Sequence, residues 1–279
     1  MGAVMSYART ETLLSVENVS LSYGSNLILR DINVKIDNLI RPELANDVTG
    51  QIIAFLGPSG IGKTQFLRIL AGLQKPTTGN VYLGHGRTPV APGLVGMVSQ
   101  QYYLYRNRTV MSNLMVSVKQ TGCNEKNGYE KCMEMLNRFD LVNKAELYPA
   151  QLSGGQRQRV AIAQQLLCSE HFLLMDEPTA GLDVKNKNRV AKLVQEVANQ
   201  DDLNTIIMVT HDIPSALAIA DTVWIMDRER DVAGNEIPGA RIVDTLDMIE
   251  LGFMWHPDVK RMPGFIDLVR EIEDRFENR

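Results

Sequence analysis

Hydrophobic and polar positions alternate in two stretches near the N-terminus, Leu13–Tyr23 and Ile32–Ile36. This period of two is typical of strands with one buried face, and it predicts a pair of antiparallel strands. Gln51–Leu56 is more uniformly apolar, as expected of a strand that is covered on both faces. A glycine-rich turn follows, and Lys63–Leu73 then carries apolar residues at helical spacing. We therefore expect antiparallel strands first, then a buried strand that leads through a turn into a helix.

From Tyr102 to Cys168 the strand pattern gives way to helical periodicity, with clear segments at Val110–Gln120 and Tyr129–Phe139. Beyond that region, strand and helix periods alternate along the chain. The alternating segments are Phe172–Met175, Asn186–Asn199, Thr205–Val209, Ile213–Ala220 and Thr222–Met226. Such alternation predicts a mainly parallel sheet flanked by helices, so the pattern is that of an α/β core with a helical insertion.

Two further segments follow neither pattern. Asp37–Thr49 is polar, contains Pro42 and predicts a surface loop between two strands. Arg228–Arg279 has loop signals and ends in a helical pattern. Its apolar positions at helical spacing are Phe265, Leu268, Val269, Ile272 and Phe276. We divide the chain into a main domain at 1–240, with a helical subdomain inserted at about 101–168, and a short C-terminal extension with an amphipathic helix at 241–279.

Composition and charge exclude several classes of function. Lys and Arg total 29 and Asp and Glu total 33, so the formal net charge of −4 gives no support to broad binding of nucleic acid, and we expect no nucleic-acid partner. The three cysteines, Cys123, Cys132 and Cys168, lack metal-ligand spacing and argue for a reducing cytoplasm over a disulfide framework. No apolar run approaches the roughly 18 residues that a membrane-spanning helix needs. These features predict a cytoplasmic location.

The turn after the buried strand reads Gly57-Pro58-Ser59-Gly60-Ile61-Gly62-Lys63-Thr64 and matches the phosphate loop in full. Its glycines let successive backbone N–H groups turn inward toward phosphates, and the following helix adds its positive dipole end. Lys63 supplies a point charge to the β- and γ-phosphates, and Thr64 a hydroxyl to Mg²⁺. A glycine-rich connector with a chance lysine is the alternative. The strand–turn–helix context favours a nucleotide site.

A second signal comes from two carboxylates that follow an apolar strand. Phe172–Met175 is followed directly by Asp176 and Glu177. This order places Asp176 near a metal ion and Glu177 one step further, toward an attacking water. Carboxylates at a solvated strand end are the alternative interpretation.

The string Leu152-Ser153-Gly154-Gly155-Gln156 identifies the family, because it resembles the signature of ATP-binding-cassette (ABC) ATPases. In that light Tyr23 resembles the aromatic residue that stacks on adenine, and Gln100 the glutamine that senses Mg²⁺ and the membrane partner. Glu177 resembles the catalytic glutamate, which leads to Asp183 in the loop that crosses the dimer interface. His211 resembles the switch histidine near the γ-phosphate. The resemblance covers about Leu13 to Met226.

The resemblance implies a complete set of site residues and a fold. The fold is an α/β P-loop NTPase, specifically an ABC nucleotide-binding domain with an N-terminal antiparallel β subdomain and an inserted helical subdomain, so 1–240 is the ABC ATPase domain. The catalytic residues are Glu177, His211 and Gln100, and the Mg²⁺ ligands are Thr64, Gln100 and Asp176. The residues that bind ATP are Tyr23, Gly57, Pro58, Ser59, Gly60, Gly62, Lys63, Thr64 and Gln65. The residues that contact ATP of a second chain are Ser153, Gly154, Gly155 and Gln156.

Several positions depart from the family pattern. Gln65 stands where a hydroxyl residue usually reaches the α-phosphate, Ser99 replaces a large apolar residue and Arg106 replaces a frequent proline. None of these changes removes a catalytic group, so we expect ATPase activity with ATP and Mg²⁺ as cofactors.

The resemblance also implies partners. Two chains close head-to-tail around two ATP molecules, either as a homodimer or with a second ABC ATPase, and Asp183 lies at that interface. We expect the ATPase subunit of an importer with integral membrane permease subunits and a substrate-binding protein, held peripherally on the inner face of the cell membrane. The C-terminal segment resembles the nitrate/sulfonate/taurine importer ATPases. The alternatives are a lipid- or lipoprotein-moving system, or a soluble ATPase that acts on a cytosolic scaffold of the iron–sulfur assembly type.

Overall fold

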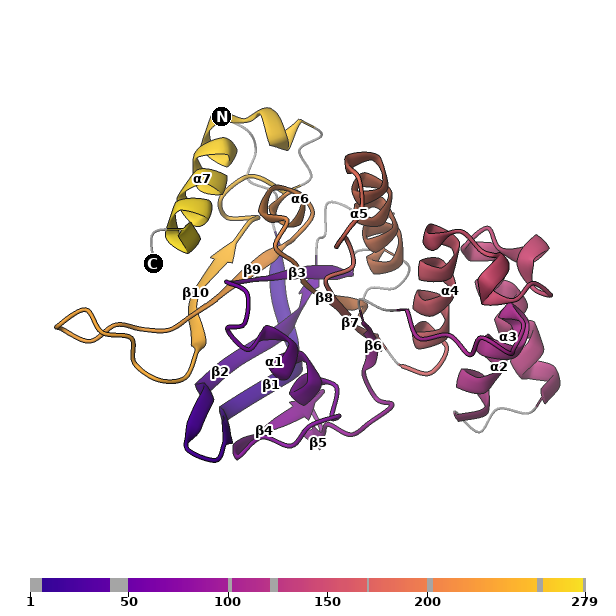
Figure 1. Ribbon diagram of the computed structural model, residues 1–279, viewed down its shortest axis with the longest axis horizontal. Coiled ribbons are helices and arrows are strands. Elements are labelled where there is room, and N and C mark those ends of the chain that lie inside the picture. The colour runs from indigo at the N-terminus through magenta and orange to yellow at the C-terminus, as the bar shows by residue number, and fades with distance from the viewer. Residues whose placement is uncertain are drawn as a thin grey trace.

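Two β-sheets and a separate group of helices make up the molecule (Figure 1). The computed structural model describes residues 7–40, 50–99, 102–120, 125–169, 171–199, 203–254 and 258–277. Within these residues the α/β fold with its antiparallel β subdomain and its inserted helices is confirmed.

The smaller sheet is antiparallel and has the strand order β2-β1-β4-β5. Its strands are β1 (Ala8–Tyr23), β2 (Asn26–Ile40), β4 (Thr78–Leu83) and β5 (Thr88–Pro89). Period-two alternation in β1 buries Leu14 and Val16 against the core, and a shift of register after Val16 precedes buried Val19. The prediction of a loop from Asp37 onward is wrong for 37–40. Asp37 pairs with Thr12 and Leu39 with Arg9, so β2 continues through these residues, and Leu39 is buried. The predicted loop residues 41–49 lie outside the described residues.

The larger sheet has the order β10-β9-β3-β8-β7-β6. Its strands are β3 (Gln51–Leu56), β6 (Gly96–Val98), β7 (Phe172–Asp176), β8 (Thr205–Val209), β9 (Thr222–Asp227) and β10 (Arg241–Asp247). All neighbours pair in parallel except β10 and β9. Val209 pairs with both Phe55 and Asp176, so the carboxyl ends of β3, β8 and β7 lie at one edge of the sheet. The turn after β3, the carboxylates after β7 and the histidine after β8 therefore meet there.

The helices divide into two groups (Figure 1). Near the central sheet lie α1 (Lys63–Leu70), α5 (Val184–Ala198), α6 (Ile213–Leu217) and α7 (Pro263–Glu277). The inserted group, drawn at the right, consists of α2 (Val110–Gln120), α3 (Glu125–Arg138) and α4 (Gly154–Leu166). Buried Leu114, Leu136 and Val160 form the core of this group. No helix among the described residues is both long and apolar enough to span a bilayer.

The C-terminal extension joins the central sheet through a strand that the sequence pattern did not predict. β10 pairs antiparallel with β9, and the loop signals around it, Gly234 and Pro238, mark the hairpin between the two strands. The final helix is present as α7, and Phe265, Val269 and Ile272 are buried on one side of it. The domain boundary at 240 stays a prediction.

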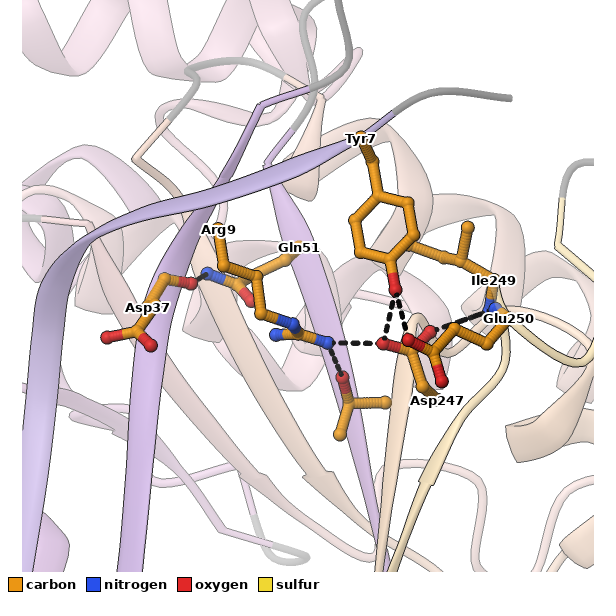
Figure 2. A network of polar contacts seen from close by, with 8 residues as sticks. Tyr7, Arg9, Asp37, Gln51, Asp247, Ile249 and Glu250 are labelled. Carbon is orange, nitrogen blue, oxygen red and sulfur yellow. Dashed lines mark hydrogen bonds and ion pairs between the residues drawn. The ribbon is translucent and has the colours of Figure 1, made fainter. Parts of the chain in front are cut away.

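A polar network connects the first strand to this extension (Figure 2). Figure 2 shows the Tyr7 hydroxyl pointing between two carboxylates, 3.1 Å from Asp247 Oδ2 and 3.0 Å from Glu250 Oε1. Arg9 Nη2 donates to the same Asp247 oxygen at 2.7 Å. Burial, together with donation to Glu250 and Asp247, raises the pKa of Tyr7 well above its ordinary value, so it remains a donor. Asp247 therefore accepts hydrogen bonds that tie the first described residues to the end of β10.

We expect Asp247→Asn to lower the free energy of unfolding by about 1–3 kcal/mol, the range for a hydrogen bond to a charged group. Asparagine keeps an oxygen for the N–H groups of Ile249 and Glu250, which Asp247 Oδ1 now accepts at 3.0 and 3.1 Å. It places an amide NH₂ group against the donors on Arg9 and Tyr7. Urea unfolding followed by circular dichroism measures the difference.

The stabilisation that the Asp247 carboxylate contributes depends on pH. Burial opposes ionisation of Asp247, but the Arg9 and Tyr7 hydrogen bonds and the Glu250 N–H lower the pKa of its carboxyl group. The stabilisation is complete above the ordinary aspartate pKa of about 4 and is lost as the pH falls through the lowered pKa of the folded state. Asp244→Asn is the control, because Asp244 makes a more exposed ion pair with Arg275 at 3.3 Å.

This control should lower the free energy of unfolding by less than about 0.5 kcal/mol. An equal decrease in the free energy of unfolding for the two variants at pH 7 would contradict the special role of Asp247.

Candidate functional site

The loop between β3 and α1 forms a cradle around the amine of Lys63. Gly62 has φ 115°, and a Cβ there would lie 2.9 Å from Leu29 Cδ2, so glycine is required. The Lys63 side chain is 8% exposed, and its Nζ donates to the carbonyl oxygens of Gly57 at 2.6 Å and Pro58 at 2.8 Å. Helix α1 begins at Lys63, and the first N–H groups of a helix have no acceptor within the helix itself. An ammonium group beside a helix N-terminus makes a site for a phosphate group.

Other predicted residues of the phosphate loop lie on its surface. Ser59, Gly60 and Thr64 are exposed, and Pro58 is half-buried. Thr64 occupies the first turn of α1, next to Lys63. These exposed residues are therefore free to contact a ligand, while the carbonyl oxygens of Gly57 and Pro58 hold the amine of Lys63.

Asp176 fits a ligand of Mg²⁺. It is the last residue of β7, and its Oδ1 is buried without a hydrogen-bond partner among the described residues. A buried carboxylate oxygen without a partner is costly unless a cation or water supplies one. Mg²⁺ prefers oxygen ligands and is commonly held by one or two protein groups together with substrate phosphates. The Asp176 carboxylate and the Thr64 hydroxyl are the described residues that suit it. Gln100, the third predicted ligand, lies outside the described residues and its role stays a prediction.

The structure brings Glu177 and His211 into contact. Glu177 Oε2 lies 2.8 Å from His211 Nδ1, although 33 residues separate them in the chain. The two residues follow the neighbouring strands β7 and β8, and the Glu177 N–H continues the ladder by donating to Val209 O at 2.9 Å. The histidine side chain is 63% exposed and the glutamate 21%. A carboxylate held by an imidazole at the sheet edge can orient a water and accept its proton.

The loop after Glu177 ends in a capped helix. The Asp183 carboxylate accepts from the Asn186 N–H at 2.9 Å and so caps α5, while the residue itself is exposed. One turn further, Lys187 Nζ lies 3.0 Å from Asp212 Oδ2. Burial opposes ionisation of Asp212, but the hydrogen bond and charge of Lys187 lower the pKa of its carboxyl group. This ion pair joins the helix after Asp183 to the loop of His211.

Tyr23 and Gln65, both predicted among the residues that bind ATP, are in contact. The Tyr23 hydroxyl donates to Gln65 Oε1 at 3.2 Å and accepts from Gln74 Nε2 at 2.6 Å. Tyr23 is 53% exposed at the end of β1. Its hydroxyl is therefore anchored beside α1 while its ring remains available for stacking on a planar group.

The signature segment forms a second helix N-terminus with room around it. Ser153 Oγ accepts from the Gln156 N–H at 3.3 Å, and Gln156 Oε1 accepts from the Ser153 N–H at 2.9 Å, which is a capping box for α4. A Cβ on Gly155 would meet nothing within 4 Å, and one on Gly154 only Arg157 Nη2 at 4.0 Å. The packing of this chain does not require either glycine. Figure 1 shows α4 well apart from α1, so this terminus does not serve the phosphate loop of the same chain.

Sequence reasoning did not find every residue of the site. Gln74, Lys187 and Asp212 make the contacts just described, and none was predicted. For Asp212 a signal was present, because aspartate two residues before Pro214 is typical of a helix N-cap, and Asp212 caps α6. Gln74 and Lys187 carry no local signal, since their partners are distant in the chain.

A hollow of about 440 Å³ lies between the segment after Gln100 and helices α2 and α4. Its lining is apolar or uncharged, with Met97, Leu104, Tyr105 and Val116 among the residues that form it. No charged residue of the described chain lines it. The hollow therefore suits an apolar or amphipathic protein segment.

Comparison with known proteins places these features in a family. Residues 48–180, which include the phosphate loop, the signature and Glu177, match the family model described as ABC transporter. The sulfate/thiosulfate import ATP-binding protein CysA of Halalkalibacterium halodurans is 38% identical over 76% of this chain, and the chain spans 58% of that relative. The nitrate import ATP-binding protein NrtD of Synechocystis is 36% identical, with 73% of this chain and 72% of the relative covered.

A solved structure has the same fold over nearly the whole chain. The cbiO1 protein of Clostridium perfringens, part of the ABC transporter complex cbiONQ, superposes with a TM-score of 0.71 at 23% identity. The match covers 96% of this chain and 97% of that one, so it includes the C-terminal extension.

We expect Lys63→Ala to weaken ATP binding about tenfold or more, because the cradle loses its buried positive charge. Isothermal calorimetry with Mg-ATP measures the affinity, and circular dichroism checks the fold. Lys192→Ala is the control, since Lys192 is 78% exposed and forms its ion pair with Glu196 on the same helix, α5. Equal ATP affinity in Lys63→Ala and the unchanged protein would contradict this assignment of the phosphate site.

Proposed function

Because this chain belongs to the ABC transporter family, we propose that it is the ATP-hydrolysing subunit of an importer whose membrane-spanning permease subunits are separate proteins. The observation that carries the proposal is the contact between Glu177 and His211 at the sheet edge that also carries the phosphate loop. The names of the relatives support ATP binding and import.

The geometry supports hydrolysis by an activated water. Lys63 and the N-terminus of α1 bind the β- and γ-phosphates, and Tyr23 stacks on the adenine. Thr64 and Asp176 would hold Mg²⁺, which when bound would supply positive charge to the phosphate oxygens. Glu177 orients the water and accepts its proton as the water oxygen attacks the γ-phosphorus and the bond to the bridging oxygen breaks. His211 holds the Glu177 carboxylate in place, and its exposed ring is free to approach the γ-phosphate of a bound nucleotide.

The second helix terminus supports a head-to-tail dimer. Ser153 and the two glycines leave an open N-terminus on α4 that phosphates of another chain can approach. Each nucleotide then lies between the phosphate loop of one chain and the signature of the other, and Asp183 lies near the interface between them. Either a second copy or a different ABC ATPase can supply the partner surface. Hydrolysis removes the shared ligand and shifts the equilibrium toward the open state.

The permease is proposed to dock in the uncharged hollow beside the segment after Gln100. A helix from a membrane protein fits a groove of this kind through its apolar side chains. The chain then lies peripherally on the inner face of the membrane. CysA and NrtD are named for different cargoes, sulfate or thiosulfate and nitrate, so the proposal extends to import and not to one substrate.

We expect Glu177→Gln to abolish steady-state ATP hydrolysis while ATP still binds, because the amide cannot accept the proton of the water. The trapped nucleotide should hold two chains together. Phosphate release measures hydrolysis, and size-exclusion chromatography with Mg-ATP measures the association of the two chains. Glu196→Gln is the control, because Glu196 is an exposed residue of α5. Turnover that persists in Glu177→Gln, or a monomer in Mg-ATP, would contradict the proposed roles.

A second substitution in the Glu177→Gln background tests the interface itself. Gly155→Val should leave the free energy of unfolding of one chain within about 0.5 kcal/mol, since its surroundings are open. It should prevent the ATP-bound dimer, because the added methyl groups fill the space that the second nucleotide needs. A dimer that forms unchanged would contradict the head-to-tail arrangement.

The partner is tested by purification of the tagged chain from its own cells in detergent, followed by mass spectrometry. We expect a multi-spanning membrane protein that remains bound after a salt wash. Recovery with a cytosolic scaffold and no membrane protein would contradict the transporter assignment and favour the soluble ATPase alternative. The ATP chemistry does not depend on this result.

A further inference from the structure

One backbone carbonyl beside Glu177 accepts two hydrogen bonds from the inserted helical region. The oxygen is that of Pro178, the residue directly after Glu177. Gln158 Nε2 donates to it at 3.2 Å, and the Tyr102 hydroxyl donates at 3.3 Å. Gln158 lies on α4, whereas Tyr102 lies in the segment that leads from the central sheet to α2. Two separate parts of the helical region therefore converge on the peptide that follows the proposed base.

Of the two donors, Gln158 is buried and Tyr102 is half-buried. Gln158 is 3% exposed, and burial raises the pKa of Tyr102 above its ordinary value. A buried amide is normally retained only where it has a hydrogen-bond partner, because an unpaired one carries a desolvation cost. The Pro178 carbonyl is that partner. These two bonds are consequently specific contacts between the helical region and the catalytic loop.

The Glu177 backbone is otherwise held by the core. Its N–H donates to Val209 O at 2.9 Å, and its own carbonyl accepts from the Ala180 N–H at 3.2 Å. Thr179 Oγ1 lies 3.3 Å from Thr210 Oγ1 in the buried space below. Glu177 itself has φ 52°, a left-handed conformation that a non-glycine residue keeps only when its surroundings impose it. The core therefore holds the backbone of Glu177 from the N-terminal side, through Val209. Tyr102 and Gln158 hold it from the C-terminal side, through the carbonyl of Pro178.

We propose that Tyr102 and Gln158 are positioning residues that set the orientation of Glu177 through the Pro178 carbonyl. The inference rests on the proposed ATPase function and adds a route by which the helical region controls it. A shift of α4 or of the Tyr102 segment relative to the central sheet either carries the Pro178 peptide with it or breaks the two bonds. Glu177 is then redirected without any change in the residues that bind ATP. Hydrolysis therefore depends on where the helical region sits.

Two conservative variants test this role. Tyr102→Phe removes one oxygen atom, and Gln158→Met keeps the length of the side chain but removes its donor. Each should lower kcat for ATP about fivefold, the effect of one neutral hydrogen bond lost from the positioned state. The KM for ATP should stay within about twofold, because neither residue contacts the nucleotide. A merely structural role would lower stability and leave kcat per folded chain unchanged.

Matched controls exist elsewhere in the chain. Gln51 is also buried, at 2% exposure, and its Nε2 donates to the backbone carbonyl of Asp37 at 3.0 Å. Tyr7 donates its hydroxyl to the carboxylates of Asp247 and Glu250 (Figure 2). Gln51→Met and Tyr7→Phe therefore remove comparable hydrogen bonds far from the site. Both should keep the kcat of the unchanged protein, with any loss confined to the free energy of unfolding.

The outcomes separate the two proposals. Absence of Mg-ATP hydrolysis by the unchanged chain would overturn the proposed function. An active unchanged chain whose Tyr102→Phe and Gln158→Met variants keep full kcat would overturn the positioning role alone. In the Glu177→Gln background, both variants should still form the ATP-bound dimer on size exclusion. Loss of that dimer would show that the two residues act on nucleotide binding or closure, which also contradicts the positioning role.

Discussion

The parallel pairing of β3, β8 and β7 is the constraint on which the rest of the site depends. Val209 pairs with Phe55 on one side and with Asp176 on the other, so the residues after all three strands emerge at one edge. Lys63, Glu177 and His211 come from segments far apart in the chain. The ladder of hydrogen bonds between strands brings these segments together. A change of register at β8 would separate Glu177 from His211, because each register step moves a strand by about 3.3 Å.

The helical region completes the site in a different way. It carries the helix terminus at Ser153 that is proposed to bind the phosphates of a second chain, on helix α4, which lies well apart from α1 (Figure 1). At the same time it reaches the catalytic loop from within the chain through Pro178. A single structural unit thus carries the proposed dimer surface, lines the hollow and contacts the Glu177 loop. If the permease docks in the hollow as proposed, this arrangement links its binding to hydrolysis through packed contacts.

The C-terminal extension supports the core from the other edge of the central sheet. β10 covers the edge of β9 with antiparallel hydrogen bonds, and an unpaired edge strand is a template for unwanted pairing. The network of Tyr7, Arg9 and Asp247 then ties this extension to the first strand (Figure 2). We assign it a role in stability, because its residues lie away from the phosphate loop.

The sequence by itself determined the chemistry and much of the architecture. The phosphate loop, the carboxylates after β7 and the signature are each encoded in a few consecutive residues, and local conformation suffices to express them. The contact between Glu177 and His211, the addition of β10 to the sheet and the two bonds to Pro178 were decided only by the tertiary structure. Each of these joins segments that are distant in the chain, so no local pattern of residues records which partner is chosen. Long-range contacts also explain why β2 continues through residues 37–40, where the polar composition predicted a loop. Pairing with β1 and burial of Leu39 outweigh the local preference of these residues for a loop.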